Sequence, residues 1–288
     1  AATEFNWTYD STSPTGAITY SAASPYKQGA TATVTATFTE ALTTTPKIAI
    51  SGVSSVAATN MTSTGSANIW TYAYTAPAGN GTDTFAFSVG TDAYGNVVTA
   101  APTSGATVTV DNTAPTISAV TQVVTPSNDT TPSYVFTTNE AGTITTNITE
   151  GFSTSASAAT GNNTVTFNTL GEGTYASKTV TVTDASGNAS SLTLTTFVVD
   201  TTSPTAAITY DAAAPFKNGD AAVTITATFN GPVLDSPVPK IAIAGSGIAN
   251  VTSTNMTKVS TTVYTYSYAI PTGDGTGTVT VGTGTDAA

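Results

Sequence analysis

Apolar and polar residues alternate with a period of two along much of the chain. Residues 31–39 read TATVTATFT, so small or apolar side chains fall on one face of this segment and threonines on the other. The same alternation puts Trp70, Tyr72 and Tyr74 on one face, and it recurs in TVTVT at 179–183. Alternation with β-branched and aromatic residues is typical of half-buried strands. The pattern therefore predicts strands at these places.

No segment of a dozen residues combines helical spacing with capping residues. Glycine (24 residues) and proline (14 residues) are spread along the chain as turn signals. About seven strands in roughly 90 to 100 residues, without helices, is typical of a β-sandwich. The sequence predicts an all-β protein built of several sandwiches.

An internal repeat divides the chain. SPTGAITYSAAS at 13–24 matches SPTAAITYDAAA at 203–214, and TPKIAISG at 45–52 matches VPKIAIAG at 238–245. The match continues to WTYAYTAPAGNGT at 70–82 and YTYSYAIPTGDGT at 264–276. Since repeats at a fixed spacing indicate copies of one structural unit, two copies are expected to flank a different unit.

A second repeated motif gives the boundaries. DSTSPT begins at Asp10, DNTAPT at Asp111 and DTTSPT at Asp200. A short polar stretch ending in proline is a compact, stiff connector. The predicted organisation is the end of a preceding unit and a connector at 1–10, unit one at 11–111, unit two at 112–200 and unit three at 201–288.

Unit three is expected to lack its last strand. Its final residues, GTDAA at 284–288, align with 90–94, after which unit one continues to Asp111. Conversely, EFNWTYD at 4–10 takes the place of a last strand before the connector of unit one. The missing strand belongs either to a continuation of the chain or to a neighbouring subunit that donates it, with EFNWTYD as the natural donor.

Composition excludes several classes of protein. The chain has no His and no Cys, which excludes zinc fingers, thiolate sites, disulfides and Ser-His-Asp triads. A net charge of −11 argues against nucleic-acid binding, because phosphates require clustered cations. No window approaches 18 consecutive apolar residues, so no membrane span is predicted.

The junction motifs DNTAPT and DTTSPT, together with TDAYGN at 91–96 and TDASGN at 183–188, resemble bacterial Ig-like (Big-type) repeats of prokaryotic cell-surface proteins. The resemblance covers essentially the whole chain. It implies tandem immunoglobulin-like β-sandwiches in an elongated array, as in adhesins, filament stalks and S-layer proteins. The Thr-rich, Arg-free and Cys-free composition is similar to that of surface-layer proteins of ammonia-oxidising archaea.

In an Ig-like sandwich the connector before each unit should approach two loops of that unit. Three groups of oxygen-bearing residues are then expected to gather. They are Asp10, Glu40, Asp92 and Asn96 in unit one, Asp111, Glu140, Asp184 and Asn188 in unit two, and Asp200 and Asp286 in unit three, where Asn230 replaces the glutamate.

Oxygen donors from separate loops suit Ca²⁺, which takes 6–8 oxygens. Carboxylates at one junction repel each other, and a divalent ion would convert that repulsion into a cross-link. The resemblance implies the same role, since calcium stiffens related Ig-like arrays. The alternative is that each D-x-x-G-N segment is only a tight turn held by local side-chain bonds to backbone N–H groups.

Acceptor sequences for N-glycans are the other candidate sites. The sequence offers candidates at Asn60, Asn80, Asn128, Asn147, Asn162 and Asn255.

The acids fall at repeated positions with the same spacing, which favours scaffolding and argues against an enzyme. Aromatic residues such as Trp70 could stack on carbohydrate, but alternation places them on one strand face, which is more often core. We expect an extracellular structural component of a cell-surface assembly, an S-layer or surface filament. It would self-associate and carry Ca²⁺ at its junctions. The alternative is the stalk of a large adhesin whose binding domain lies outside this segment.

Overall fold

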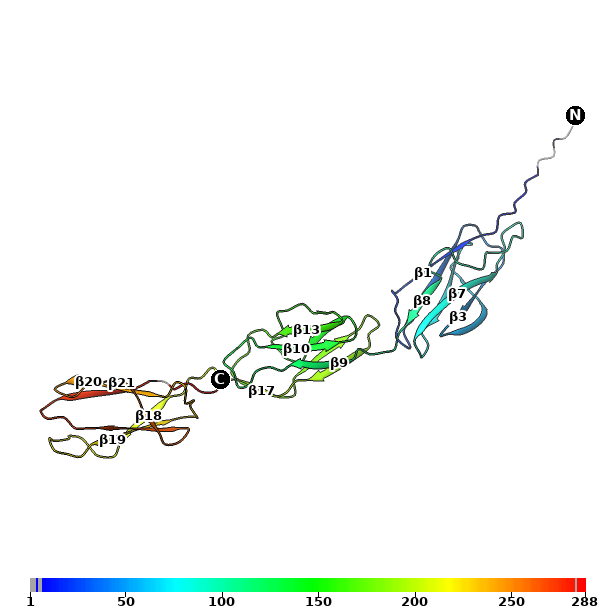
Figure 1. Ribbon diagram of the computed structural model, residues 1–288. Helices are drawn as coiled ribbons and strands as arrows, with labels where there is room; N and C mark the ends of the chain where they lie inside the picture. Colours follow the sequence, from blue (N-terminus) through cyan, green and yellow to red (C-terminus); the bar gives the residue numbers. More distant parts are fainter. Residues whose placement is uncertain (1–3, 5–6, 283) are drawn as a thin grey trace.

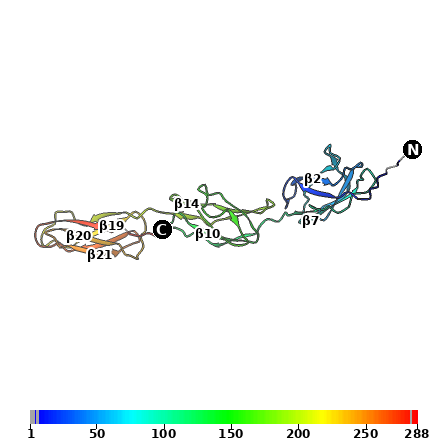
Figure 2. The same ribbon diagram turned by 90° about the horizontal axis from the view of Figure 1, so that it is seen from above.

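A computed structural model describes all residues except 1–3, 5–6 and 283. It shows three bodies arranged in a row, with residues 7–10 extending from the first of them (Figures 1 and 2). Within the described residues every regular element is a strand, and no helix exists that could cross a membrane. The expected all-β class is therefore confirmed.

Unit one consists of two four-stranded antiparallel sheets that enclose one hydrophobic core. The first sheet has the order β1-β2-β6-β5, and the second has the order β4-β3-β7-β8. The strands are β1 (Gly16–Tyr20), β2 (Thr31–Phe38), β3 (Pro46–Ser51), β4 (Ser55–Asn60), β5 (Thr62–Ser63), β6 (Ile69–Thr75), β7 (Gly81–Val89) and β8 (Thr107–Val110).

Unit two has its own core and three sheets, of three, four and two strands. Their orders are β13-β10-β9, β12-β11-β15-β16 and β14-β17. The strands are β9 (Ile117–Thr121), β10 (Ser133–Thr138), β11 (Gly142–Thr146), β12 (Ser157–Ala158), β13 (Gly161–Thr166), β14 (Gly173–Tyr175), β15 (Thr179–Thr183), β16 (Ala189–Thr193) and β17 (Phe197–Val199).

Unit three repeats the sheets of unit one except for the last strand. Its orders are β18-β19-β23-β22 and β21-β20-β24. The strands are β18 (Ala206–Tyr210), β19 (Val223–Phe229), β20 (Lys240–Ser246), β21 (Val251–Asn255), β22 (Thr257–Lys258), β23 (Val263–Tyr268) and β24 (Thr276–Val281). Within the described residues β24 pairs with β20.

Alternating burial follows the alternating sequence. In β2 the four positions Ala32, Val34, Ala36 and Phe38 are all buried, while the threonines between them face outward or lie at the margin. Phe38 packs against Phe87 of the opposite sheet, with ring centroids 4.9 Å apart. The apolar face of each strand thus supplies the core, and burial of that face holds the two sheets together.

The last strand of units one and two also contacts an earlier segment in parallel. Val110 in β8 forms a parallel bridge with Tyr26, and Val199 in β17 forms one with Ser127. Tyr26 N donates to Thr109 O, and Asp111 N donates back to Tyr26 O. This brace ties the point where the chain leaves the unit to a segment near the unit's beginning.

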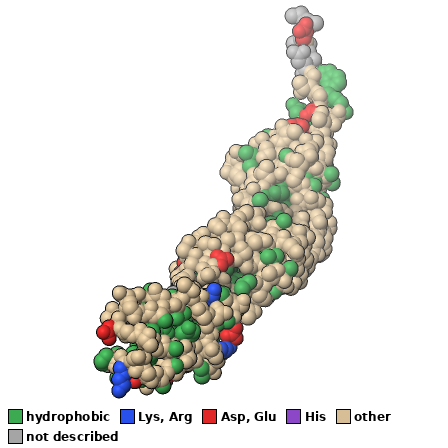
Figure 3. Space-filling view, turned by 60° about the vertical axis from the view of Figure 1, so that its left-hand side comes forward, with side chains coloured by type: hydrophobic (Ala, Val, Ile, Leu, Met, Phe, Trp, Pro, Cys, Tyr) green, Lys and Arg blue, Asp and Glu red, His purple; other side chains and the backbone are tan. Residues whose placement is uncertain are grey.

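On the face shown in Figure 3, few atoms belong to charged side chains, and hydrophobic side chains are scattered among other side chains and backbone. Threonine and serine supply roughly a third of the chain, and the outward strand positions are largely theirs.

Candidate metal centres

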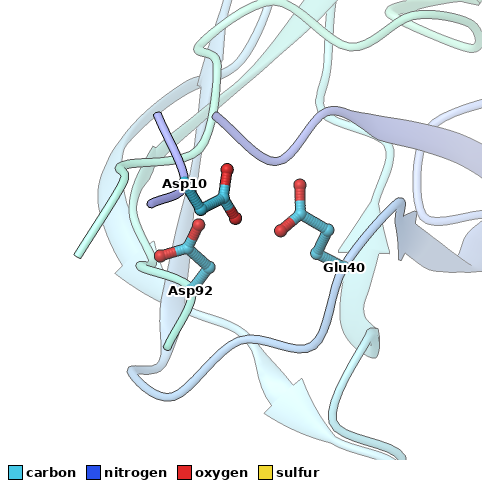
Figure 4. A group of neighbouring side chains, drawn as sticks. All are labelled: Asp10, Glu40 and Asp92. Atoms are coloured by element: carbon cyan, nitrogen blue, oxygen red, sulfur yellow. The ribbon is translucent and has the colours of Figure 1, made fainter. Parts of the chain in front are cut away.

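Three carboxylates from separate segments meet at the start of unit one. Asp10 lies in the connector before β1, Glu40 follows β2, and Asp92 follows β7. One oxygen from each lies within 4.8 Å of the others, and Figure 4 shows the three carboxylates turned toward one another. The predicted convergence of these three residues is what the structure has.

The loop after β7 orients Asp92. Its Oδ1 accepts hydrogen bonds from the backbone N–H groups of Tyr94 (2.8 Å) and Asn96 (2.9 Å). Gly95 between them has φ +90°, a conformation that side-chain-bearing residues rarely adopt. The D-x-x-G-N sequence therefore forms a tight turn whose aspartate is fixed by the backbone.

Asn96 joins this turn to the connector. Its Nδ2 donates to Asp92 Oδ2 at 2.8 Å and to the backbone carbonyl of Asp10 at 3.3 Å. The amide nitrogen, and not the oxygen, thus faces the carboxylates. In this orientation Asn96 positions Asp92 and Asp10, and its role as a metal ligand stays a prediction.

The environment shifts the pKa values of two of the three carboxyl groups in opposite directions. Desolvation, followed by the negative charges of Asp10 and Asp92, raises the pKa of Glu40 above its usual value. Burial also opposes ionisation of Asp92, but the hydrogen bonds from Asn96, Tyr94 and Gly95 outweigh it and lower its pKa. Glu40 is the group that would gain most from a nearby cation.

The second group repeats the first at the junction of units one and two. Asp111, Glu140 and Asp184 each place an oxygen within 4.8 Å of the others. Asp184 Oδ1 accepts from the backbone N–H groups of Ser186 and Asn188, and Asn188 Nδ2 donates to Asp184 Oδ2 and to Asp111 O at 3.0 Å.

Asp111 is bonded to both units. Its N–H donates to Tyr26 O of unit one, while its carbonyl accepts from Asn188 of unit two. Ser186 Oγ donates to Asp111 Oδ2 at 3.2 Å, and Lys27 Nζ of unit one donates to Gly187 O of unit two at 3.4 Å. The second centre therefore lies on the contact between the units.

Unit three does not form such a group within the described residues. Asp200 Oδ1 accepts from Thr202 N, and Asp286 Oδ1 accepts from Ala288 N. Asn230, at the glutamate position, accepts from Thr205 N through Oδ1. With only two acids available, a three-carboxylate centre cannot form from these positions, and the metal roles of Asp200 and Asp286 stay predictions.

The two complete groups fit a hard cation such as Ca²⁺. Oxygens bound to Ca²⁺ lie about 2.4 Å from it, so two ligands of one ion are at most about 4.8 Å apart. A carboxylate has about four acceptor positions. On Asp92 three acceptor positions take hydrogen bonds, so one is left for a cation. On Asp10 one acceptor position takes a hydrogen bond, so about three are left. Within the described residues the one ion pair joins Lys258 and Asp235, so neither group is neutralised by lysine.

Several contributors were missing from the sequence analysis. Ser186 occupies a variable position of the D-x-x-G-N motif, where unit one has Tyr94, and Lys27 has Lys217 as its counterpart in the other copy of the repeat. Asp83 is a buried carboxylate (0% exposed) that accepts from Ser54 N at 2.6 Å and from Tyr74 Oη at 2.8 Å. Alternation in TDTFAF at 82–87 would have revealed it, because Asp83 shares the face of Phe85 and Phe87.

The predicted glycan positions all lie on the surface. The six asparagines are exposed: Asn60, Asn80, Asn128, Asn147, Asn162 and Asn255. Two of them are engaged in hydrogen bonds, since Asn80 Nδ2 donates to Thr113 Oγ1 and Asn147 Oδ1 accepts from Thr179 N. Glycosylation at any of them stays a prediction.

Comparisons with known proteins add no family. No protein-family model matches the sequence, and no curated protein matches it. A search of solved structures gives E. coli alpha-2-macroglobulin in its native conformation, with 9% identity and a TM-score of 0.22, over 98% of this chain and 23% of that one. The chain thus spans less than a quarter of that protein's length, and so low a TM-score carries no inference.

Proposed function

We propose that this chain is a structural segment of a cell-surface assembly, an S-layer or surface filament, built of tandem Ig-like sandwiches and stiffened by Ca²⁺ at its junctions. The observation that carries the proposal is the recurrence of one three-carboxylate group, with the same hydrogen bonds, at the same place in two successive units.

The order of strands supports the Ig-like part of the proposal. An Ig-like sandwich has an ABED sheet opposite a CFG sheet. The order β1-β2-β6-β5 corresponds to A-B-E-D, and β3-β7-β8 corresponds to C-F-G, with β4 added at the edge. Units with this connectivity enter at one end and leave at the other, which suits an extended array.

The electrostatics support the calcium part. At neutral pH three carboxylates at the second centre repel one another while Asp111 is bonded to both units. A divalent ion bound there would attach the connector and two loops of unit two to one point. The angle between units one and two would then vary less, and a rod of fixed shape follows.

Thermal unfolding of the whole chain with Ca²⁺, with Mg²⁺ and with a chelator tests the proposal. A ligand at 100 times its dissociation constant stabilises the state it binds by about 2.7 kcal/mol. We expect Ca²⁺ to raise the melting temperature more than Mg²⁺, because Mg²⁺ gives up its water reluctantly.

Asp184→Ala should lose the gain from the second centre, while Asp129→Ala, an exposed aspartate of the same unit, should retain it. Equal melting temperatures in Ca²⁺ and in chelator would contradict the calcium site and would indicate that the D-x-x-G-N segment is a tight turn only. Electron microscopy distinguishes a surface assembly from an adhesin stalk. A lattice or filament protein should assemble when Ca²⁺ is present, whereas an adhesin stalk should remain a single rod.

A further inference from the structure

The fold divides the acceptor sequences for N-glycans into two groups. The chain has nine N-x-[S/T] sequences, of which the one at Asn6 lies outside the described residues. Four have a side-chain amide that is buried or hydrogen-bonded: Asn80, Asn147, Asn188 and Asn250. Four are exposed and make no side-chain hydrogen bond within the part of the chain that the structure describes: Asn60, Asn128, Asn162 and Asn255. Because a glycan is attached to the amide nitrogen, the second group is the one ready to accept it in the folded chain.

Two asparagines of the second group occupy equivalent positions in the repeat. The sequence TNMT recurs in units one and three where the chain passes from one sheet to the other. In unit one Asn60 ends β4 and Thr62 begins β5, and Met61 between them is buried in the core (3% exposed). Since side chains alternate along an extended chain, the amide of Asn60 and the hydroxyl of Thr62 are exposed together. Asn255 has the same relation to Met256, which is 4% exposed.

A lysine stands directly opposite each of these two asparagines. Lys47 of β3 pairs with Asn60 of β4, and Lys240 of β20 pairs with Asn255 of β21. Directly opposite residues of an antiparallel pair have Cβ atoms about 4.5–5.5 Å apart, so the long lysine side chain reaches its neighbour. Among the described residues neither ammonium group has a hydrogen-bond or ion-pair partner. Two of the six cations of a chain with net charge −11 are therefore placed beside acceptor sequences.

These lysines do not protect a sheet edge, which is a common role of lysine in β-proteins. β3 and β20 are inner strands, and the edges of the two sheets are β4 and β21. Those edge strands read SVAATN and VTSTN, so neither has a charged residue or a proline. A glycan on the last residue of each edge strand would cover an edge that the strand itself leaves unguarded.

We propose that Asn60 and Asn255 carry N-linked glycans, in which a sugar near the protein bears an acidic group paired with Lys47 or Lys240. In the transfer step the asparagine Nδ2 attacks the anomeric carbon of a glycan carried on a lipid diphosphate. A bond forms between Nδ2 and that carbon, and the bond from the carbon to the phosphate oxygen breaks. The lipid diphosphate leaves with the electron pair, and the proton lost from Nδ2 passes to a base of the oligosaccharyltransferase.

Charge selects the kind of sugar. With a net charge of −11, the surface as a whole repels an acidic glycan. Beside Lys47 that repulsion is replaced by attraction, because the carboxylate of a uronic acid or the sulfate of a sulfated sugar accepts charge-assisted hydrogen bonds from the ammonium group. Asn162 provides the contrast. It is exposed and lies in the edge strand β13, but the residue opposite it is Thr137, so a glycan there has no cation to meet.

Mass spectrometry of the chain isolated from the cells that produce it is the first test. We expect glycopeptides at Asn60 and Asn255 that contain a uronic acid or a sulfated sugar, and unmodified peptides at Asn80 and Asn147. Unmodified Asn60 and Asn255 would overturn the proposal. A cross-linked pair of peptides in which Lys47 is joined to Asn60 with loss of ammonia would also overturn it, and would indicate an amide bond between the two side chains.

Glycan transfer to the purified, folded chain tests the selection by the fold. The chain is incubated with an oligosaccharyltransferase and lipid-diphosphate-linked N,N′-diacetylchitobiose. Two hydrogen bonds hold the side chain of Asn80, so its initial rate of modification should be at least about tenfold below that of Asn60. Thr62→Ala removes the hydroxyl of the acceptor sequence and should abolish modification at Asn60 while Asn255 is modified as before. Equal rates at Asn80 and Asn60 would contradict the selection.

The reactivity of the lysines tests the contact with an acidic sugar. Chains are prepared with the neutral disaccharide or with one whose second sugar is glucuronic acid, and are treated with an amine-acetylating reagent. Lys47 should react about twofold more slowly in the acidic form, the size expected for an exposed ion pair. The difference should vanish in about 1 M salt, where the Debye length is about 3 Å. Equal rates at low salt would overturn the contact.

Asn60→Gln supplies the matched control within one molecule. Lys47 should then react equally in both forms, whereas Lys240, beside Asn255, should keep the difference. The proposal rests on the extracellular setting of the proposed function, because the transferred glycan is added to exported chains. Transfer and acetylation use the purified chain in a chelator, without calcium and without assembly. Their failure is therefore distinct from a failure of the junction sites or of the surface assembly.

Discussion

Replacing Asp83 with alanine is expected to destabilise unit one strongly. This carboxylate lies inside the sandwich and accepts short hydrogen bonds from Ser54 N and Tyr74 Oη. Burial, and next the hydrogen bond to Asp83, raise the pKa of Tyr74, so its hydroxyl remains a donor at neutral pH. In Asp83→Ala both donors lose their partner away from water.

The structure gives the size of the effect. A hydrogen bond to a charged group contributes about 1.5–3 kcal/mol, so the two together amount to about 3–6 kcal/mol. Removing the buried charge also removes its desolvation cost, which places the net loss near the lower end, about 3 kcal/mol. In a domain of this size each kcal/mol shifts the melting temperature by about 4–8 °C, so a fall of at least about 12 °C follows.

Urea unfolding followed by tryptophan fluorescence measures this loss. The chain has two tryptophans, so in a Trp7→Phe background Trp70 reports on unit one alone. Thr84→Ala, the outward neighbour on β7, is the control and should stay within about 0.5 kcal/mol. Asp83→Asn keeps an acceptor for Ser54 and should lose only about 1 kcal/mol. A loss below about 1 kcal/mol in Asp83→Ala, or one equal to that of the control, would refute the reasoning.

Three other changes test the remaining features. Asn188→Ala removes the donor that joins Asp184 to the carbonyl of Asp111. The change should destabilise unit two by about 2 kcal/mol and widen the distribution of angles between units one and two. Small-angle scattering identical to that of the parent would contradict the second expectation. In the folded state the pKa of Glu40 lies above its usual value of 4.5. The protonated carboxyl group therefore contributes to stability below pH 4.5, and this contribution is lost as the pH rises through the raised pKa. Thermal unfolding in chelator should therefore show Glu40→Gln to be more stable than the parent at pH 7 and equally stable near pH 3. A parent that is more stable than Glu40→Gln at pH 7 would contradict the predicted direction of the effect. Gly52→Ala would place a Cβ 2.0 Å from Thr82 O at φ +134°, so a loss of at least about 2 kcal/mol is expected in urea unfolding, whereas Gly65→Ala, with φ +93° but open space around it, should lose less.

Most of the strand framework could be predicted because it depends on local alternation. The periodic segment at 31–39 became β2, and the repeat placed β18 to β24 against β1 to β7. The shortest strands, β5, β12 and β22, have two residues each and carry no periodicity. Their pairing is decided by neighbours distant in sequence, which a local pattern does not contain.

The acidic groups were predictable as sets of residues but not as geometry. The junction motif and the D-x-x-G-N motif bring Asp10 and Asp92 together once a sandwich is assumed. Which atom of Asn96 faces them depends on the hydrogen bonds available from the folded turn, and here the nitrogen has two acceptors. Sequence spacing gives the residue and not the orientation of its amide.

The parallel brace at the exit of units one and two has a mechanical consequence. When the array is pulled from its ends, tension enters unit one at Asp10 and leaves at Asp111, along the direction of β8. The bonds from Tyr26 to Thr109 and Asp111 then lie across the pull and are strained together in shear, as are those of Ser127 in unit two. Bonds loaded simultaneously resist more force than bonds opened one after another. Each braced unit should therefore bear tension without lengthening.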